Sequence, residues 1–180
     1  MKHFIVLLVS LLASSPSLAE RHQIGLGLGG ADLDGRDSDG GFAAQLNYSY
    51  QFQPNLAAEI GRIGASGIAS STVSTLLGDT KETIDFSNTY LGMRANYYLL
   101  SFVNAYAMGG ATYSEVEKSI EVKKTGAKTT DKSDGLGGYI GAGLELVAFD
   151  SVGFGLEYRK FYMHDNYKSN SVLLMANIKF

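Results

Sequence analysis

The residues best suited to chemistry in this sequence are five charged side chains that lie among small and apolar neighbours: Glu59, Arg94, Glu145, Glu157 and Arg159. Two carboxylates at a suitable separation could act as general acid and base, and a row of charges could also conduct ions. An unpaired ion is costly to bury, because it loses its hydration. We therefore favour a structural interpretation, in which these side chains form ion pairs. Glu157 and Arg159 support it, because residues two apart in a strand point to the same face.

A nucleophilic, metal or cofactor site is not predicted. The sequence has no cysteine, and it shows neither a metal-ligand spacing nor a glycine-rich phosphate loop before a helix. His164 lies near Asp165 and Ser169 and could suggest a hydrolase, but a histidine at the edge of a loop is more often simply solvated. We predict no catalytic residue, no metal and no cofactor.

Strands rather than helices would position the charges, because the dominant hydrophobic period is two. Phe42 to Phe52 alternates over eleven residues without interruption. Seven further runs alternate in the same way: Gln23–Gly30, a run beginning at Leu56, a run ending near Leu99, Phe102 to about Tyr113, Leu136–Ala148, Val152–Arg159 and Val172–Phe180. Eight strands is an even number, as bacterial membrane barrels require.

Short and long connections alternate between these runs. The short ones are Gln53–Asn55, Leu100–Ser101 and Phe149–Ser151, and the long ones are Asp32–Gly40, Ala65 to about Thr83, Ser114–Asp134 and His164–Asn170. Turns at one end and loops at the other are typical of outer-membrane barrels. The lysine-rich stretch Lys118–Lys132 is expected to be a solvated hairpin extension, with an anion-binding patch as the alternative.

Side-chain volume indicates which face is outside. An eight-stranded barrel encloses roughly one layer of side chains, and the apolar face is too bulky for that space: Phe42, Leu46, Tyr48, Tyr50, Phe52, Leu91, Met93, Tyr97, Tyr106, Met108, Leu144, Leu146, Phe154, Leu156, Tyr158, Leu174 and Phe180. The opposite face is mostly glycine, alanine, serine and asparagine. We therefore predict that the apolar face meets lipid.

Aromatic residues near the strand ends predict two interfacial girdles. One would hold Tyr50, Phe52, Tyr97, Phe102, Phe149, Phe154 and Phe180, close to the short turns or the C-terminus. The other, near the long loops, would hold Phe42, Phe86, Tyr113, Phe161 and Tyr162.

Residues 1–19 have the features of a secretory signal peptide, with Lys2 and His3 before an apolar stretch and a small-residue cleavage site ending at Ala19. An uncleaved anchor is the alternative. Residues 20–180 would then form one domain with 14 basic and 18 acidic residues once Lys2 is removed. This balance argues against a nucleic-acid partner. No later stretch is apolar enough for a spanning helix, so membrane insertion would require a closed barrel.

The mature chain resembles the eight-stranded outer-membrane barrels typified by the transmembrane domain of outer membrane protein A and by outer membrane protein X. The similar segments are Ala58-Glu59-Ile60-Gly61, Leu91 to Tyr97 with Arg94, Met108-Gly109-Gly110, Gly143-Leu144-Glu145 and Gly155-Leu156-Glu157-Tyr158. This resemblance implies an all-β fold, an eight-stranded antiparallel up-and-down transmembrane β-barrel in the outer membrane of a Gram-negative cell.

The end of the chain also resembles that family. Leu174, Ala176, Ile178 and Phe180 are similar to the signal read by the barrel-assembly machinery, which implies this machinery and periplasmic chaperones as partners during biogenesis. Gly155 stands where the outer membrane protein A barrel would carry an inward arginine, so the ion-pair gate of that barrel is not expected here. No periplasmic domain is expected after the eighth strand.

Three functions follow as hypotheses. We favour a non-enzymatic surface protein whose four external loops contact lipopolysaccharide or external partners. The first alternative is a lipid A-modifying enzyme, which His164 with Ser169 and Ser171 faintly resembles. In the deacylase pattern a serine follows the histidine by two residues, but the residue two positions after His164 is Asn166. The second alternative is a small pore, although a lumen containing Tyr98, Tyr139 and paired charges should be closed to all but small ions.

Overall fold

The computed structural model describes residues 21–34, 39–66, 80–122, 127–148 and 151–180. The expected signal peptide, residues 1–19, and Phe149 of the girdle near the short turns lie outside these ranges. Within them, no helix is long and apolar enough to cross a bilayer.

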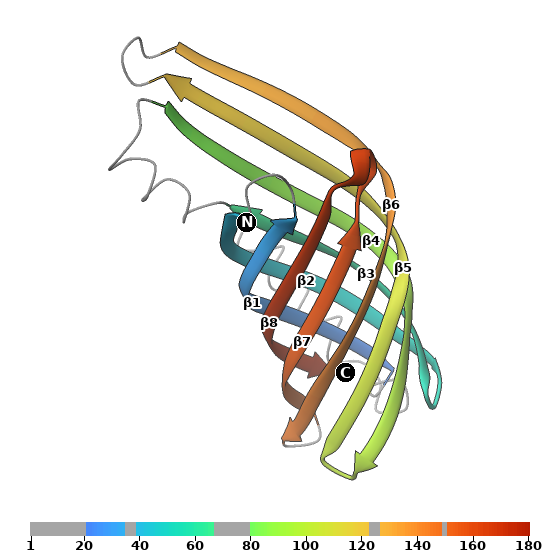
Figure 1. The fold of residues 1–180 in the computed structure, drawn as a ribbon. Helices are drawn as coiled ribbons and strands as arrows, with labels where there is room; N and C mark the ends of the chain where they lie inside the picture. Colours follow the sequence, from blue (N-terminus) through green and yellow to red (C-terminus); the bar gives the residue numbers. More distant parts are fainter. Residues whose placement is uncertain (1–20, 35–38, 67–79, 123–126, 149–150) are drawn as a thin grey trace, which may run out of the picture.

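Eight antiparallel strands form a closed barrel (Figure 1), which confirms the predicted fold class. The strands are β1 (His22–Asp34), β2 (Asp39–Gln53), β3 (Leu56–Ser66), β4 (Thr80–Leu100), β5 (Val103–Val122), β6 (Ala127–Ala148), β7 (Val152–Tyr162) and β8 (Lys168–Lys179), with a short 3-10 helix η1 (His164–Asn166) before β8. Each strand pairs with the next in sequence, and β8 closes the barrel by pairing with β1.

The strand register fixes the width of the barrel. A row of directly opposed residues that starts at Leu136 in β6 and is followed once around the wall returns to β6 at Leu146, ten residues further along the strand. Such a stagger tilts the strands by roughly 35–45°. The lumen of this barrel therefore holds only about one layer of side chains.

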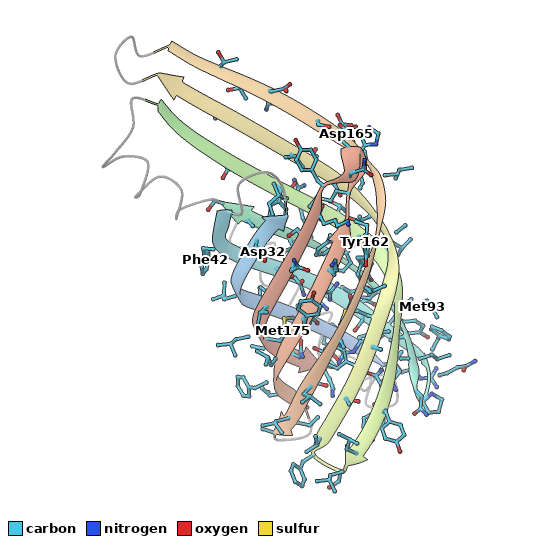
Figure 2. The ribbon with its side chains drawn as sticks, viewed as in Figure 1. Asp32, Phe42, Met93, Tyr162, Asp165 and Met175 are labelled. Carbon is cyan, nitrogen blue, oxygen red and sulfur yellow. The ribbon has the colours of Figure 1, made fainter. Side chains whose placement is uncertain are left out.

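Bulky apolar side chains cover the outside of the wall, as the sequence indicates. Leu91 is 61% exposed and Leu174 is 70% exposed, and Figure 2 shows Phe42 projecting away from the barrel. Glycines on the inner face leave room for larger neighbours. A Cβ atom on Gly143 would lie 2.4 Å from the ring of Tyr106. Of the girdle expected near the long loops, the outer girdle, three members are exposed on the outer face: Phe42, Tyr113 and Tyr162.

The expected positions of Tyr106 and Met108 are wrong. Their bulk predicts that they face lipid, but both side chains are buried inside the barrel. The outward positions of β5 from 105 to 111 hold only alanine and glycine, so the larger residues of this strand are the inward ones. Gly143 and Gly141 of β6 provide the space that the two side chains occupy.

Three other aromatic residues also differ from expectation. Phe86 and Phe161 are not part of the outer girdle, because both point inward and are buried. Phe86 follows the outward Asp85, and Phe161 follows the outward Lys160. The alternation of inward and outward residues along a strand therefore predicts side-chain orientation better than proximity to a long loop does. Tyr98 is 47% exposed and does not lie in the lumen, because it lines a pocket of about 320 Å³ at the turn end of the barrel, beside Arg21 and Lys179.

Strands β4, β5 and β6 continue well beyond their neighbours (Figure 1). The ladder between β5 and β6 runs without a break from Val103↔Leu146 to Val122↔Ala127, so most of the expected Ser114–Asp134 loop is strand. Pairing with β7 stops at Gly138, and pairing with β3 stops at Asp85. We call residues 80–84, 112–122 and 127–137 the extension.

Depth-dependent substitutions test the orientation of the wall. Met93 lies midway along the outward face of β4, whereas Leu136 of β6 lies at the level where β7 pairing has already ended. We expect Met93→Arg to lower the free energy of unfolding in lipid vesicles by about 2–4 kcal/mol and Leu136→Arg by about 0–1 kcal/mol. Denaturant titration gives the difference, with the faster gel migration of unboiled protein as the check of barrel formation. Equal effects of the two substitutions would contradict a lipid-facing wall.

Candidate functional site

The upper part of the lumen contains an ion triad centred on Arg159 of β7. The guanidinium Nη2 lies 2.8 Å from Oε1 of Glu59 on β3, and Nε lies 2.5 Å from Oε1 of Glu157. All three side chains are fully buried. Gln45 donates to Glu157 at 2.9 Å and Asn47 donates to Glu59 at 3.2 Å, so neighbouring amides complete the coordination of both carboxylates.

A second cluster lies nearer the turn end and is centred on Glu145 of β6. Its Oε2 lies 3.5 Å from Arg94 Nη2 and 3.2 Å from Lys179 Nζ. Asn104 and Asn177 donate to the same carboxylate at 3.3 and 2.8 Å. Lys179 is absent from the sequence-based set, although its position between the outward residues 178 and 180 places it on the inner face.

Tyrosines join the two clusters and cover their cations. The Arg94 Cζ atom lies 3.6 Å from the centroid of the Tyr106 ring, and the Tyr106 hydroxyl donates to Glu157 at 3.1 Å. Arg159 Cζ lies 4.3 Å from the centroid of the Tyr90 ring. Each arginine therefore combines an ion pair with a cation–π contact, and neither tyrosine is in the set predicted from sequence.

An aromatic cluster closes the lumen on the extracellular side of Arg159. The ring centroids of Tyr90, Tyr139 and Phe161 lie 5.0, 6.2 and 5.7 Å apart. Ile63 and Leu173 are fully buried beside them in the same core cluster. Close-packed rings at this level leave the charged clusters shielded from the extracellular end.

The arrangement suits structural closure better than catalysis. The structure brings the five predicted charges onto one inner face and adds Lys179, so that three cations face three carboxylates. Each carboxylate is fully buried and accepts from a cation and from at least one amide. Glu59 and Glu145 pair with cations of other strands, so these contacts join the wall across the lumen. No cluster of three or more metal-ligating side chains occurs among the described residues.

His164 does not assemble with the serines that the deacylase alternative requires. Ser169 and Ser171 are buried on the inner face, whereas the His164 side chain is 55% exposed at the rim. His164 Nε2 lies 3.2 Å from Asp165 Oδ1, and the nearby Ser133 hydroxyl donates to Asp165 at 2.7 Å. Within the described part of the chain, no hydrogen bond joins His164 to a serine.

The residues of the expected assembly signal form the outward face of the closing strand. Leu174, Ala176 and Ile178 are exposed on β8, and Phe180 exchanges two backbone hydrogen bonds with His22, at 3.0 and 2.9 Å. The rings of Phe180 and His22 stack with centroids 5.7 Å apart. The pairing of the first and last strands therefore continues to Phe180.

Removing one member of the Arg159 triad should be more harmful than removing all of its charges. Arg159→Met leaves Glu59 and Glu157 without their cation, and we expect the free energy of unfolding to fall by about 3–5 kcal/mol. The triple variant with Glu59→Gln and Glu157→Gln removes the uncompensated charge and should recover most of that loss. Urea titration in detergent micelles measures both. A single variant as stable as the parent would show that the carboxylates are solvated and the triad is not closely packed.

Comparison with known proteins agrees with this fold. A family model described as the outer membrane protein beta-barrel domain matches residues 4–180. No curated protein matches the chain. Identities to the solved structures are low and therefore show the fold alone.

Three solved structures illustrate the likeness. Ail, the attachment invasion locus protein of Yersinia pestis, has a TM-score of 0.64 and 16% identity, covering 89% of this chain and 99% of that one. Neisserial surface protein A has a TM-score of 0.67 and 14% identity, with 88% and 97% covered. The N-terminal barrel domain of OprF from Pseudomonas aeruginosa has a TM-score of 0.60 and 9% identity, again with 88% and 97% covered. With a family model spanning almost the entire chain and a closed eight-stranded barrel to match it, this chain belongs to the outer membrane protein β-barrel family.

Proposed function

We propose that this outer-membrane barrel is a non-enzymatic surface protein that contacts lipopolysaccharide and external partners through its extracellular end. The observation that carries the proposal is the combination of a filled lumen with a rigid extension. Both charged clusters and the aromatic cluster occupy the interior, so the barrel acts as an anchor. Binding then depends on the surfaces that the barrel presents outside.

The extension is suited to presenting a binding surface. Its strands are held by a continuous ladder, and Lys132 Nζ lies 2.8 Å from Glu117 Oε2 across β5 and β6. A preformed surface loses less conformational entropy on binding than a flexible loop does. Its sequence carries both acidic and basic residues, which favours polar partners over an apolar one.

One structural neighbour supports an external ligand. Ail, to which this chain is similar in fold, has been solved in complex with the heparin analogue sucrose octasulfate. By analogy, the extracellular end of this barrel would contact charged polymers or glycolipids at the cell surface. We further propose that residues 1–19 direct export and that Leu174, Ala176, Ile178 and Phe180 are read by the barrel-assembly machinery, with periplasmic chaperones acting before insertion.

Shortening the extension tests the surface role. In the variant, an Asn-Gly turn replaces residues 118–131 and joins Glu117 to Lys132, which are direct partners in the register. We expect cells that carry it to lose at least tenfold in adhesion to immobilised heparin and to epithelial monolayers. The control variant carries Asn-Gly in place of Ser101-Phe102, the turn between β4 and β5 at the opposite end. Unchanged adhesion by a correctly inserted, shortened protein would count against the proposal.

Conductance distinguishes an anchor from a pore. We expect the parent protein to be silent in planar bilayers at steady voltage, because paired charges and the aromatic cluster fill the lumen. Phe161→Ala removes one ring of that cluster and should introduce brief openings. A steady parental conductance that Glu145→Ala abolishes would replace the anchor by an ion path.

A further inference from the structure

The outer wall near the extracellular girdle differs in charge between its two sides. On the side of β3 to β6, the outward cations Arg62 and Lys132 each have a carboxylate partner. Arg62 Nη2 lies 3.0 Å from Glu115 Oε2 and Lys132 Nζ lies 2.8 Å from Glu117 Oε2. Asp85 and Asp134 add further negative charge, because both line the same groove with Glu115 and Glu117. Among the side chains described on this side, the positive charges are therefore already paired.

The side formed by β7 and β8 carries two outward cations without such partners. Among the side chains that the structure describes, no carboxylate forms an ion pair with Lys160 or Lys168. The register places Asp34 of β1 directly opposite Lys168. Asp32 of the neighbouring β1 is occupied differently, because its Oδ1 accepts the backbone N–H and the side-chain amide of Asn170, each at 2.9 Å. Both ammonium groups therefore have hydrogen-bond donors to offer to an external anion.

The register places the lysines within reach of one another. Lys160 is directly opposite Asn170 and Lys168 is directly opposite Tyr162, so the lysines form a diagonal pair on the outer face of adjacent strands. The Cβ atoms of such a pair lie about 7–8 Å apart. Two flexible four-carbon stems from these positions can converge on a single anionic group.

Their depth is that of the membrane interface. Lys160 lies between the outward residues Tyr158 and Tyr162, and Val172 and Leu174 continue the apolar wall below Asn170. Lys160 Nζ lies 5.8 Å from the centroid of the Tyr162 ring, so its stem rises from the apolar band towards the girdle, as an interfacial lysine does. The Tyr158 hydroxyl donates to the Asn170 side chain at 2.8 Å, so a polar group lies directly below the two lysines.

We propose that Lys160 and Lys168 bind a phosphate group of lipid A on the outer wall of β7 and β8. The inference rests on the proposed lipopolysaccharide contact and names the place and the chemistry of that contact. A phosphorylated glycolipid fits because its phosphate lies at the interface while its acyl chains lie along Tyr158, Val172 and Leu174. A soluble phosphate would lack these apolar contacts.

Lipid A with and without phosphate provides the probe. The full protein is placed in phosphatidylcholine nanodiscs, and its binding of bisphosphorylated lipid A and of the dephosphorylated form is measured. We expect each of Lys160→Gln and Lys168→Gln to weaken binding of the phosphorylated form about fivefold and the double variant about 25-fold. Arg62→Gln is the matched control, because Arg62 is an outward cation already paired with Glu115, and it should change binding less than twofold. The migration of unboiled protein shows that each variant is folded.

Each contrary outcome has a distinct meaning. If the double variant binds phosphorylated lipid A as the parent does, the lysine site is wrong while the lipopolysaccharide contact stands. If the parent binds both forms of lipid A equally, phosphate recognition is wrong. If it binds neither form, the lipopolysaccharide part of the proposed function fails as well. Displacement of lipid A by equimolar inorganic phosphate would overturn the assignment to a lipid headgroup.

Discussion

Closure of the hydrogen-bonded wall is the constraint on which the rest of the structure depends. In hydrocarbon, backbone groups have no water to bind, so every strand must be paired on both sides. With eight strands and a return to β6 ten residues along, closure also fixes how much can fit inside. The glycines facing Tyr106 and Asn47 are consequences of this limit, because any larger residue there would overlap the side chains that fill the lumen.

The same limit explains why the interior is charged yet neutral. A narrow lumen cannot hydrate isolated ions, and each carboxylate is therefore compensated by a cation. Glu59 and Glu145 pair with cations of other strands, and Glu157 pairs with Arg159 of its own strand. Arg159 connects β7 to β3 through Glu59, and Lys179 connects β8 to β6 through Glu145. These pairs cross the lumen rather than follow the wall. They add contacts between strands that the backbone ladder does not join.

The strand number, the alternating faces and the five inner charges could be predicted from sequence, because period two and side-chain volume both depend on the wall alone. Tyr106 and Met108 could not be placed, because β5 has small residues outside and its larger ones fill space made by Gly141 and Gly143 of another strand. Phe161 could not be placed for a similar reason, since its packing depends on Tyr90 and Tyr139. Prediction of side-chain orientation from sequence fails where the packing partner that decides it is distant in sequence.

A sealed, neutral interior restricts specificity to the outside, and the outside is asymmetric. On one side Arg62 is paired with Glu115, and the extension continues beyond the neighbouring strands (Figure 1). On the other side the wall ends at η1 and the Asp32–Asn170 bonds, and Lys160 and Lys168 form no ion pair with a described side chain. Because the barrel cannot change its register without breaking the closed ladder, the two surfaces stay fixed relative to each other. A lipid held by β7 and β8 would therefore keep a fixed position relative to the extension.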